Sequence, residues 1–213
     1  MEKSLIVFCM LSALFGPTMF SSPVQAIPIT TTLNISNENL GLPGNDYATV
    51  NVALTGLHTV TFTVDANEAL LGAGTNFGIQ RFGFNTSLNL SLSDFSFSNS
   101  NWGIQSNQNV SQFGIFNDVA SGTGNSRQEP LIFSITNSSI TDELQFFIAN
   151  QLGYHYSAHI ADFNGVTALG PDGQQITSAY FSDGTAPVPE PATLLLLGSG
   201  IVGLAGFRKK MKI

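Results

Sequence analysis

The stretch VNVALTGLHTVTFTV, residues 50–64, decides the expected fold. Apolar residues alternate with mostly small or polar ones over 50–54 and again over 60–64, and residues 55–58 between them read Thr-Gly-Leu-His. Period-two alternation places the apolar side chains on one face of a β-strand. A short connection that contains glycine joins antiparallel strands. The stretch therefore predicts a β-hairpin with one buried face.

The same alternation recurs along the central part of the chain. Phe95 and Phe97 continue it on odd-numbered positions, so residues 93–94 must form a bulge or tight turn that shifts the phase. Residues 65–71 predict a short helical turn with Asp65 as its cap. We expect an all-β domain, an antiparallel β-sandwich of jelly-roll-like type. Further strands are predicted over 88–92, 131–135 and 144–148.

Residues 1–26 have the order of a secretory signal peptide. Lys3 supplies a positive charge, residues 5–15 are apolar, and Pro17 ends the expected signal-peptide helix. Small residues stand at positions −3 and −1 of a cleavage site after Ala26. We predict cleavage there by signal peptidase. A retained N-terminal anchor is the alternative, and the short apolar run disfavours it.

The C-terminal tail, residues 188–213, combines a tetrapeptide, an uncharged apolar run over 192–207 and a basic cluster. As a helix the apolar run would be about 24 Å long, against a hydrocarbon core of roughly 30 Å. This transmembrane helix would place the basic cluster on the cytoplasmic side, and an ordinary single-pass anchor is one interpretation. The tetrapeptide is Val188, Pro189, Glu190 and Pro191, and the basic cluster comprises Arg208, Lys209 and Lys210.

These three parts, in this order, resemble the PEP-CTERM sorting signal of bacterial exported proteins. The resemblance covers residues 188–210. It implies that exosortase, an integral-membrane enzyme, recognises Pro189, Glu190 and Pro191 and removes the tail. It also implies a Gram-negative bacterium that makes exopolysaccharide. The protein would pass through an inner-membrane intermediate and end at the cell surface or in the extracellular biofilm matrix.

Removing both signals leaves a predicted β-domain over 27–183, joined to the tail by a linker over 184–187. The only cysteine, Cys9, lies in the signal peptide, so the mature domain has no disulfide and no cysteine metal ligand. Two arginines against twelve acids leave a net charge of −10 over residues 27–187. Such a surface repels nucleic acid and anionic membranes. We therefore expect no nucleic-acid partner.

The sequence lacks a recognisable catalytic constellation. Gly-x-Ser-x-Gly and phosphate-loop motifs are absent. His155 and His159 have the spacing of two zinc ligands, but on the predicted strand they would be about 13 Å apart. A secreted hydrolase that uses carboxylates or a metal remains the alternative to a non-catalytic protein. Asp142 and Glu143 are adjacent and would point to opposite faces of a strand, so they could not act as its acid pair. Asp65 with Glu68, or Asp94 with Asp118, could form such a pair only if the tertiary fold brings them together.

Aromatic and acidic residues provide the candidate ligand contacts. Trp102, Tyr154 and Tyr156 could stack on sugar rings if they are exposed, and core packing is the alternative. Asp46 and Asp172 lie in predicted turns and would suit calcium. The sequence thus predicts a non-catalytic exported protein with a structural or glycan-binding role and exopolysaccharide as a candidate ligand. A permanently membrane-anchored β-domain is a further alternative.

Overall fold

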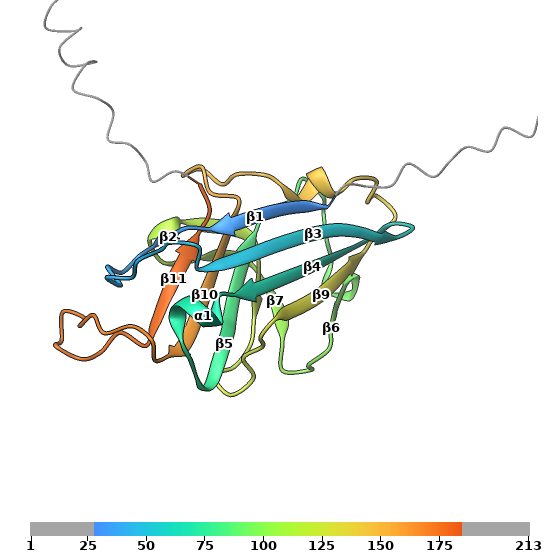
Figure 1. The fold of residues 1–213 in the computed structure, drawn as a ribbon. Helices are drawn as coiled ribbons and strands as arrows, with labels where there is room; N and C mark the ends of the chain where they lie inside the picture. The colour runs from blue at the N-terminus through green and yellow to red at the C-terminus, as the bar shows by residue number, and fades with distance from the viewer. Residues whose placement is uncertain (1–27, 185–213) are drawn as a thin grey trace, which may run out of the picture.

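A computed structural model describes residues 28–184, in which strands predominate (Figure 1). Among these residues there is one short α-helix, and three 3-10 turns complete the regular structure. The strands are β1 (Ile29–Leu33), β2 (Ile35–Ser36), β3 (Ala48–Gly56), β4 (Thr59–Ala66), β5 (Ala73–Phe84), β6 (Phe95–Phe97), β7 (Gly103–Asn109), β8 (Ile115–Ser121), β9 (Leu131–Thr136), β10 (Tyr156–Phe163) and β11 (Ser178–Ser182). The helical elements are α1 (Glu68–Leu71), η1 (Leu92–Asp94), η2 (Ser111–Phe113) and η3 (Glu143–Phe146).

The strands form two antiparallel sheets, which confirms the all-β prediction. The five-stranded sheet has the order β1-β3-β4-β9-β6, and the six-stranded sheet has the order β2-β11-β10-β5-β8-β7. Three pairs of consecutive strands, β3–β4, β7–β8 and β10–β11, are neighbours within one sheet. These hairpins give the sheets a partly meandering order, and the jelly-roll-like detail stays a prediction.

The predicted hairpin over 50–64 is present and supplies the centre of the core. Its register pairs Val52 with Phe62, and both side chains are buried. The Phe62 ring stacks on Phe133 of the same sheet, with centroids 4.8 Å apart and ring planes at 5°. It also lies 4.9 Å from the ring of Phe84 in the six-stranded sheet. The alternation in the sequence therefore marks the face that packs between the two sheets.

The opposite face of the five-stranded sheet is lined by hydroxyls. Thr61, Ser134 and Ser96 stand side by side in the strand register. The hydroxyls of Thr61 and Ser134 are 3.1 Å apart. Strand alternation shows which residues of each strand belong to this face. Among residues 28–184, Asp65 is the only charged one of them. The face is polar and nearly uncharged.

The outer face of the six-stranded sheet carries a second, smaller core. Val119 lies opposite Gly83 in the register, on the face away from the main core. A side chain at Gly83 could not fit, since its Cβ would lie 2.9 Å from the ring of Phe116. The second core consists of Val110, Phe113, Phe116, Val119 and Tyr154.

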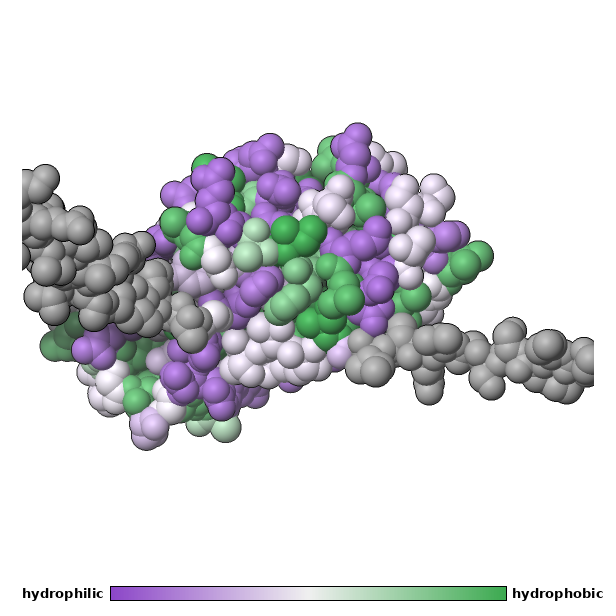
Figure 2. All heavy atoms as spheres, turned by 90° about the horizontal axis from the view of Figure 1, so that it is seen from above, coloured by the Kyte–Doolittle hydropathy of each residue, from purple (hydrophilic) through white to green (hydrophobic). Residues whose placement is uncertain are grey.

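Exposed large hydrophobic residues are scattered over the domain. They include Leu57 in the first hairpin turn, Ile132 on β9 and Leu169 in the connection to β11. On the face shown in Figure 2, hydrophilic and hydrophobic residues are interspersed around a small central hydrophobic group. This distribution is the usual one for an independently folded domain surface.

Two of the predicted strands are wrong, because local capping replaces strand pairing. Residues 88–92 form no strand, and Asp94 Oδ2 accepts a 2.7 Å hydrogen bond from the backbone N–H of Ser91. Residues 144–148 contain the end of η3, which Asp142 caps with its side chain. Asp side chains bond nearby backbone groups and so compete with sheet formation. The predicted strand over 131–135 is confirmed as β9.

The helical turn expected over 65–71 is confirmed as α1, but its cap is not Asp65. Asn67 caps the helix, since its Oδ1 accepts a 3.0 Å hydrogen bond from the N–H of Leu70. No helix within residues 28–184 is long and apolar enough to cross a membrane. The predicted signal peptide, the sorting tetrapeptide, the transmembrane helix and the basic cluster all lie outside the described residues.

Candidate functional site

The aromatic residues considered as sugar contacts are in the protein interior. Trp102 is 6% exposed, and its Nε1 donates a 2.6 Å hydrogen bond to the carbonyl oxygen of Ser126. Tyr156 is 0% exposed, and its hydroxyl donates to the carbonyl oxygen of Phe146 at 3.0 Å. Tyr154 belongs to the second core. Core packing, the interpretation weighed against sugar contact, is therefore confirmed for Trp102, Tyr154 and Tyr156, and these rings are not exposed for stacking on a sugar.

The two aspartates considered for calcium lie in separate loops. Asp172 Oδ1 accepts a 3.0 Å hydrogen bond from the N–H of Gln174 and so stabilises its own turn. Asp46 borders a shallow depression together with Asp65 and Glu68. Within the described chain, no three His, Cys, Asp or Glu side chains are grouped so that they could hold a metal ion. Calcium binding at Asp46 and Asp172 stays a prediction.

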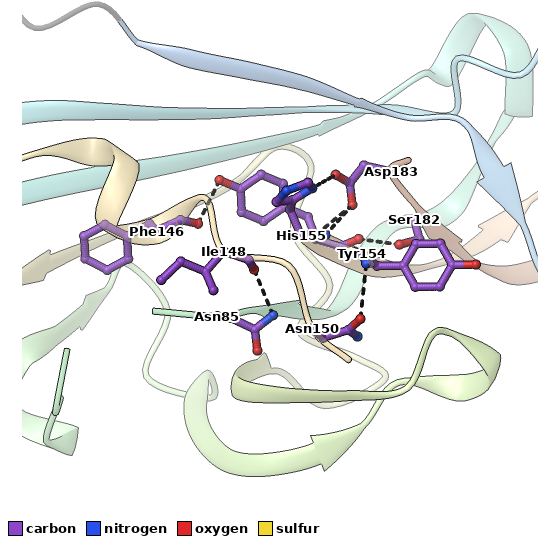
Figure 3. A network of polar contacts seen from close by, with 9 residues as sticks. Asn85, Phe146, Ile148, Asn150, Tyr154, His155, Ser182 and Asp183 are labelled. Atoms are coloured by element: carbon purple, nitrogen blue, oxygen red, sulfur yellow. Dashed lines mark hydrogen bonds and ion pairs between the residues drawn. The ribbon is translucent and has the colours of Figure 1, made fainter. Parts of the chain in front are cut away.

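A polar network holds the end of β11 against the start of β10 (Figure 3). Asp183 Oδ1 accepts hydrogen bonds from the N–H groups of His155 and Tyr156, both at 2.9 Å. Asp183 Oδ2 lies 2.8 Å from Nδ1 of His155. The His155 ring is parallel to that of Phe147, with centroids 3.8 Å apart. These bonds fix the point at which the chain leaves the domain toward the tail.

A groove of about 620 Å³ lies beside this network. One side is formed by the start of β8 and the turn before it, and the other by the loop that follows η3. We call it the amide groove, because carboxamide side chains dominate its polar lining. Its lining residues are Asn85, Asn107, Gly114, Ile115, Asn117, Ile148, Ala149, Asn150, Gln151 and Leu152.

Two of these carboxamides hold the sides of the groove together. Asn85 donates from Nδ2 to the carbonyl oxygen of Ile148 at 3.1 Å and accepts at Oδ1 from the N–H of Asn117 at 2.9 Å. Asn150 donates from Nδ2 to the carbonyl oxygen of Phe113 at 2.7 Å. Figure 3 shows the bond from Asn85 to Ile148, and it shows the 3.1 Å bond that Asn150 Oδ1 accepts from the N–H of Tyr154. The shape of the groove is therefore fixed by hydrogen bonds before a ligand arrives.

Other groups of the amide groove are available to a ligand. The side chains of Asn107 and Gln151 are exposed and make no hydrogen bond to residues 28–184. Asn117 is exposed beside them, and its Nδ2 donates to the carbonyl oxygen of Thr86 at 3.4 Å, so its Oδ1 is the atom without a partner among residues 28–184. Ile115 is 60% exposed and Leu152 is 53% exposed. Among residues 28–184, no charged side chain lines the groove. The arrangement suits an uncharged ligand that has both hydroxyl groups and C–H surfaces.

The amide groove was not predicted from the sequence. Its carboxamides come from the end of β5, from β7 and β8, and from the loop before β10. The abundance of asparagine in the domain was the only sequence signal, and it does not identify which residues meet.

The acid pairs required by a hydrolase are only partly brought together. Asp142 caps η3, Asp94 lies in η1, and Asp118 lies on β8 of the six-stranded sheet. An unexpected acid, Glu129, lies near Asp65. Burial, together with the neighbouring Asp65 carboxyl, raises the pKa of Glu129 to about 9.

Glu129 resembles a general acid in its pKa but not in its accessibility. Its Oε1 accepts a 2.8 Å hydrogen bond from the N–H of Ala66, and its Oε2 is buried without a partner among the described residues. A general acid must come within hydrogen-bond reach of the substrate. Oε2, the oxygen that has no hydrogen-bond partner, is buried and out of reach of a substrate. The geometry therefore favours a structural role for Glu129.

We expect Glu129→Gln to stabilise the protein at alkaline pH. The unfolded carboxyl loses its proton above about 4.5, whereas the folded one keeps it until about 9. Stability therefore decreases as pH rises through this interval, and glutamine removes that dependence. After allowance for partial solvent screening, the gain at pH 8 should be about 1–2 kcal/mol, with no gain at pH 4.

Urea denaturation at several pH values measures this difference. Asp46→Asn, at an exposed acid, is the control. If Asp46→Asn raised the stability at pH 8 by the same amount, the stabilisation would come from the lower negative net charge. That result would contradict a specific role of the burial of Glu129.

The comparison with known protein families concerns the tail. Residues 187–210 match the PEP-CTERM protein-sorting motif, which confirms the resemblance seen in the sequence. Neither a curated protein nor a solved structure matches the chain. The motif implies an exported protein that exosortase sorts, through a membrane-anchored intermediate, to the cell surface.

Proposed function

We propose that this protein is a non-catalytic component of the cell surface or of an exopolysaccharide matrix, and that it binds neutral polysaccharide in the amide groove. The observation that carries the proposal is the uncharged lining of this groove in a domain with a net charge of −10. Sorting by exosortase would bring the domain to the place where such polymers accumulate.

The chemistry of the lining fits a sugar. A carboxamide offers a donor and an acceptor side by side, which matches two adjacent hydroxyls of a pyranose. The exposed aliphatic side chains of Ile115 and Leu152 can cover the C–H surface of the ring. Because Asn85 and Asn150 already fix the groove, little ordering entropy is lost on binding.

The absence of catalysis is part of the proposal. Among residues 28–184, no Asp, Glu or His lines the amide groove, so a bound glycosidic bond would have no acid or base beside it. The most perturbed acid, Glu129, is shielded as described above. A hydrolase would need a second site, and the acids of the domain favour none.

The proposal is tested with the double variant Asn117→Ala, Gln151→Ala in the full chain. Binding is first sought on an array of neutral and acidic oligosaccharides and then measured by calorimetry with the best neutral oligosaccharide. Each lost neutral hydrogen bond should cost about 1 kcal/mol, so the affinity should fall by roughly 30-fold.

Gln174→Ala removes an exposed amide far along the chain from the groove and is the matched control. It should bind as the unaltered protein does. The glycan-binding proposal would be overturned if the unaltered protein retained no neutral oligosaccharide, or if the double variant bound as tightly as the control.

A further inference from the structure

The two cationic side chains of residues 28–184 are brought to one place on the six-stranded sheet. Arg81 on β5 is the register neighbour of His159 on β10. Arg127 reaches the same strand, donating from Nη1 to the carbonyl oxygen of Asn76 at 3.1 Å and from Nε to Gln80 Oε1 at 3.4 Å. Two arginines that are 46 positions apart in the sequence thus converge on the strand β5.

Neither arginine is neutralised by a described acid. Residues 28–184 hold twelve Asp and Glu side chains, yet none of them lies within ion-pair distance of either arginine. Nε of Arg81 is buried and has no hydrogen-bond partner among these residues. A guanidinium carries five N–H donors and no acceptor. Because Nε is buried, the donors that an anion from outside can reach are those of Nη1 and Nη2, which make no hydrogen bond to residues 28–184 and have no carboxylate beside them.

The charges act on the histidine between them. Burial, together with the charges of Arg127 and Arg81, lowers the pKa of His159 to about 4. The His159 ring is therefore neutral at pH 7 and adds no positive charge. It stacks on Tyr180 of β11, with centroids 4.4 Å apart and planes at 21°. The two rings reduce local contact with water, which strengthens ion pairing at the adjacent guanidinium.

We propose that Arg81 and Arg127 form a binding site for the carboxylate of an acidic sugar. Arginine binds carboxylates with two parallel hydrogen bonds, so the unused donors of Arg81 match a uronate group. The surrounding net charge of −10 opposes a densely charged polymer. The site therefore fits a polysaccharide in which uronate residues are separated by neutral ones.

This site goes beyond the neutral-sugar site of the amide groove, and the two are separable. The lining of the amide groove includes neither arginine. The test is calorimetric titration of the full chain with a glucuronate-containing oligosaccharide and with its neutral glucose analogue. Arg81→Gln should weaken glucuronate binding at least tenfold, and Arg81→Lys, which keeps the charge but not the two-pronged geometry, should weaken it less.

The double variant Asn117→Ala, Gln151→Ala serves as the control and should keep its affinity for glucuronate. A failure of the arginine site is therefore distinguishable from a failure of the amide groove. Ring-proton NMR shifts of His159 and Tyr180 in the unaltered protein locate the ligand even if an arginine variant fails to fold. Absence of glucuronate binding, or binding that leaves these rings and the Arg81→Gln variant unaffected, would overturn the proposal. Equal binding of glucose 6-phosphate or glucose 6-sulfate would overturn its selectivity for carboxylate.

Discussion

Phe62→Ala should lower the free energy of unfolding by about 3–5 kcal/mol, a large share of the total stability of a domain of this size. Phe62 is fully buried and lies between the sheets. It stacks on Phe133 and contacts Phe84, as described above. Alanine would leave a cavity at the point where the two sheets share most of their aromatic contacts. The other rings near Phe62 are Phe82, Phe146 and Tyr156.

Urea denaturation followed by circular dichroism gives the measurement. Ile132→Ala is the matched control, because Ile132 lies on the neighbouring strand but on the solvent face and is 45% exposed. Its cost should stay within about 0.5 kcal/mol, as is usual for surface substitutions. A cost for Phe62→Ala no greater than that of the control would contradict the central position of this ring.

The parts of the fold that were predicted correctly are those in which no local interaction competes with strand alternation. The hairpin over 50–64 has uninterrupted alternation and a glycine turn, so its strands, its turn and its buried face follow from the sequence. Residues 88–92 and 144–148 alternate equally well. In these two segments, capping by the side chains of Asp94 and Asp142 replaces strand pairing. The alternation in the sequence does not indicate whether capping or strand pairing is the stronger interaction.

The functional residues also differ in whether the sequence alone identifies them. The sorting motif is linear, so its residues are recognisable without a structure. Trp102 stands in a polar context, and only the fold shows that its N–H meets the carbonyl of Ser126. The convergence of Arg81 and Arg127 depends on strand register, with an irregularity between His159 and Ile160, and register cannot be deduced from alternation alone.

Alanine in place of Pro189, Glu190 and Pro191 should abolish removal of the tail. The prolines are expected to keep the segment extended and without two of its N–H donors. Glu190 is the only acid between Asp183 and the end of the sequence, so it marks the segment by charge. The match to the PEP-CTERM motif assigns recognition to this stretch. The expected result is complete retention of the altered protein in the membrane fraction.

Intact mass of the protein from culture medium and from membranes is the measurement. The unaltered protein should lack residues 1–26 and the tail, whereas the altered one should lack only residues 1–26. Leu196→Ile, a conservative change in the apolar run, is the control and should be processed normally. If the unaltered protein itself keeps Arg208 in the membrane fraction, the tail is a permanent anchor and processing by exosortase is contradicted. If the altered protein is released like the unaltered one, recognition depends on the apolar run and the basic cluster instead of the tetrapeptide.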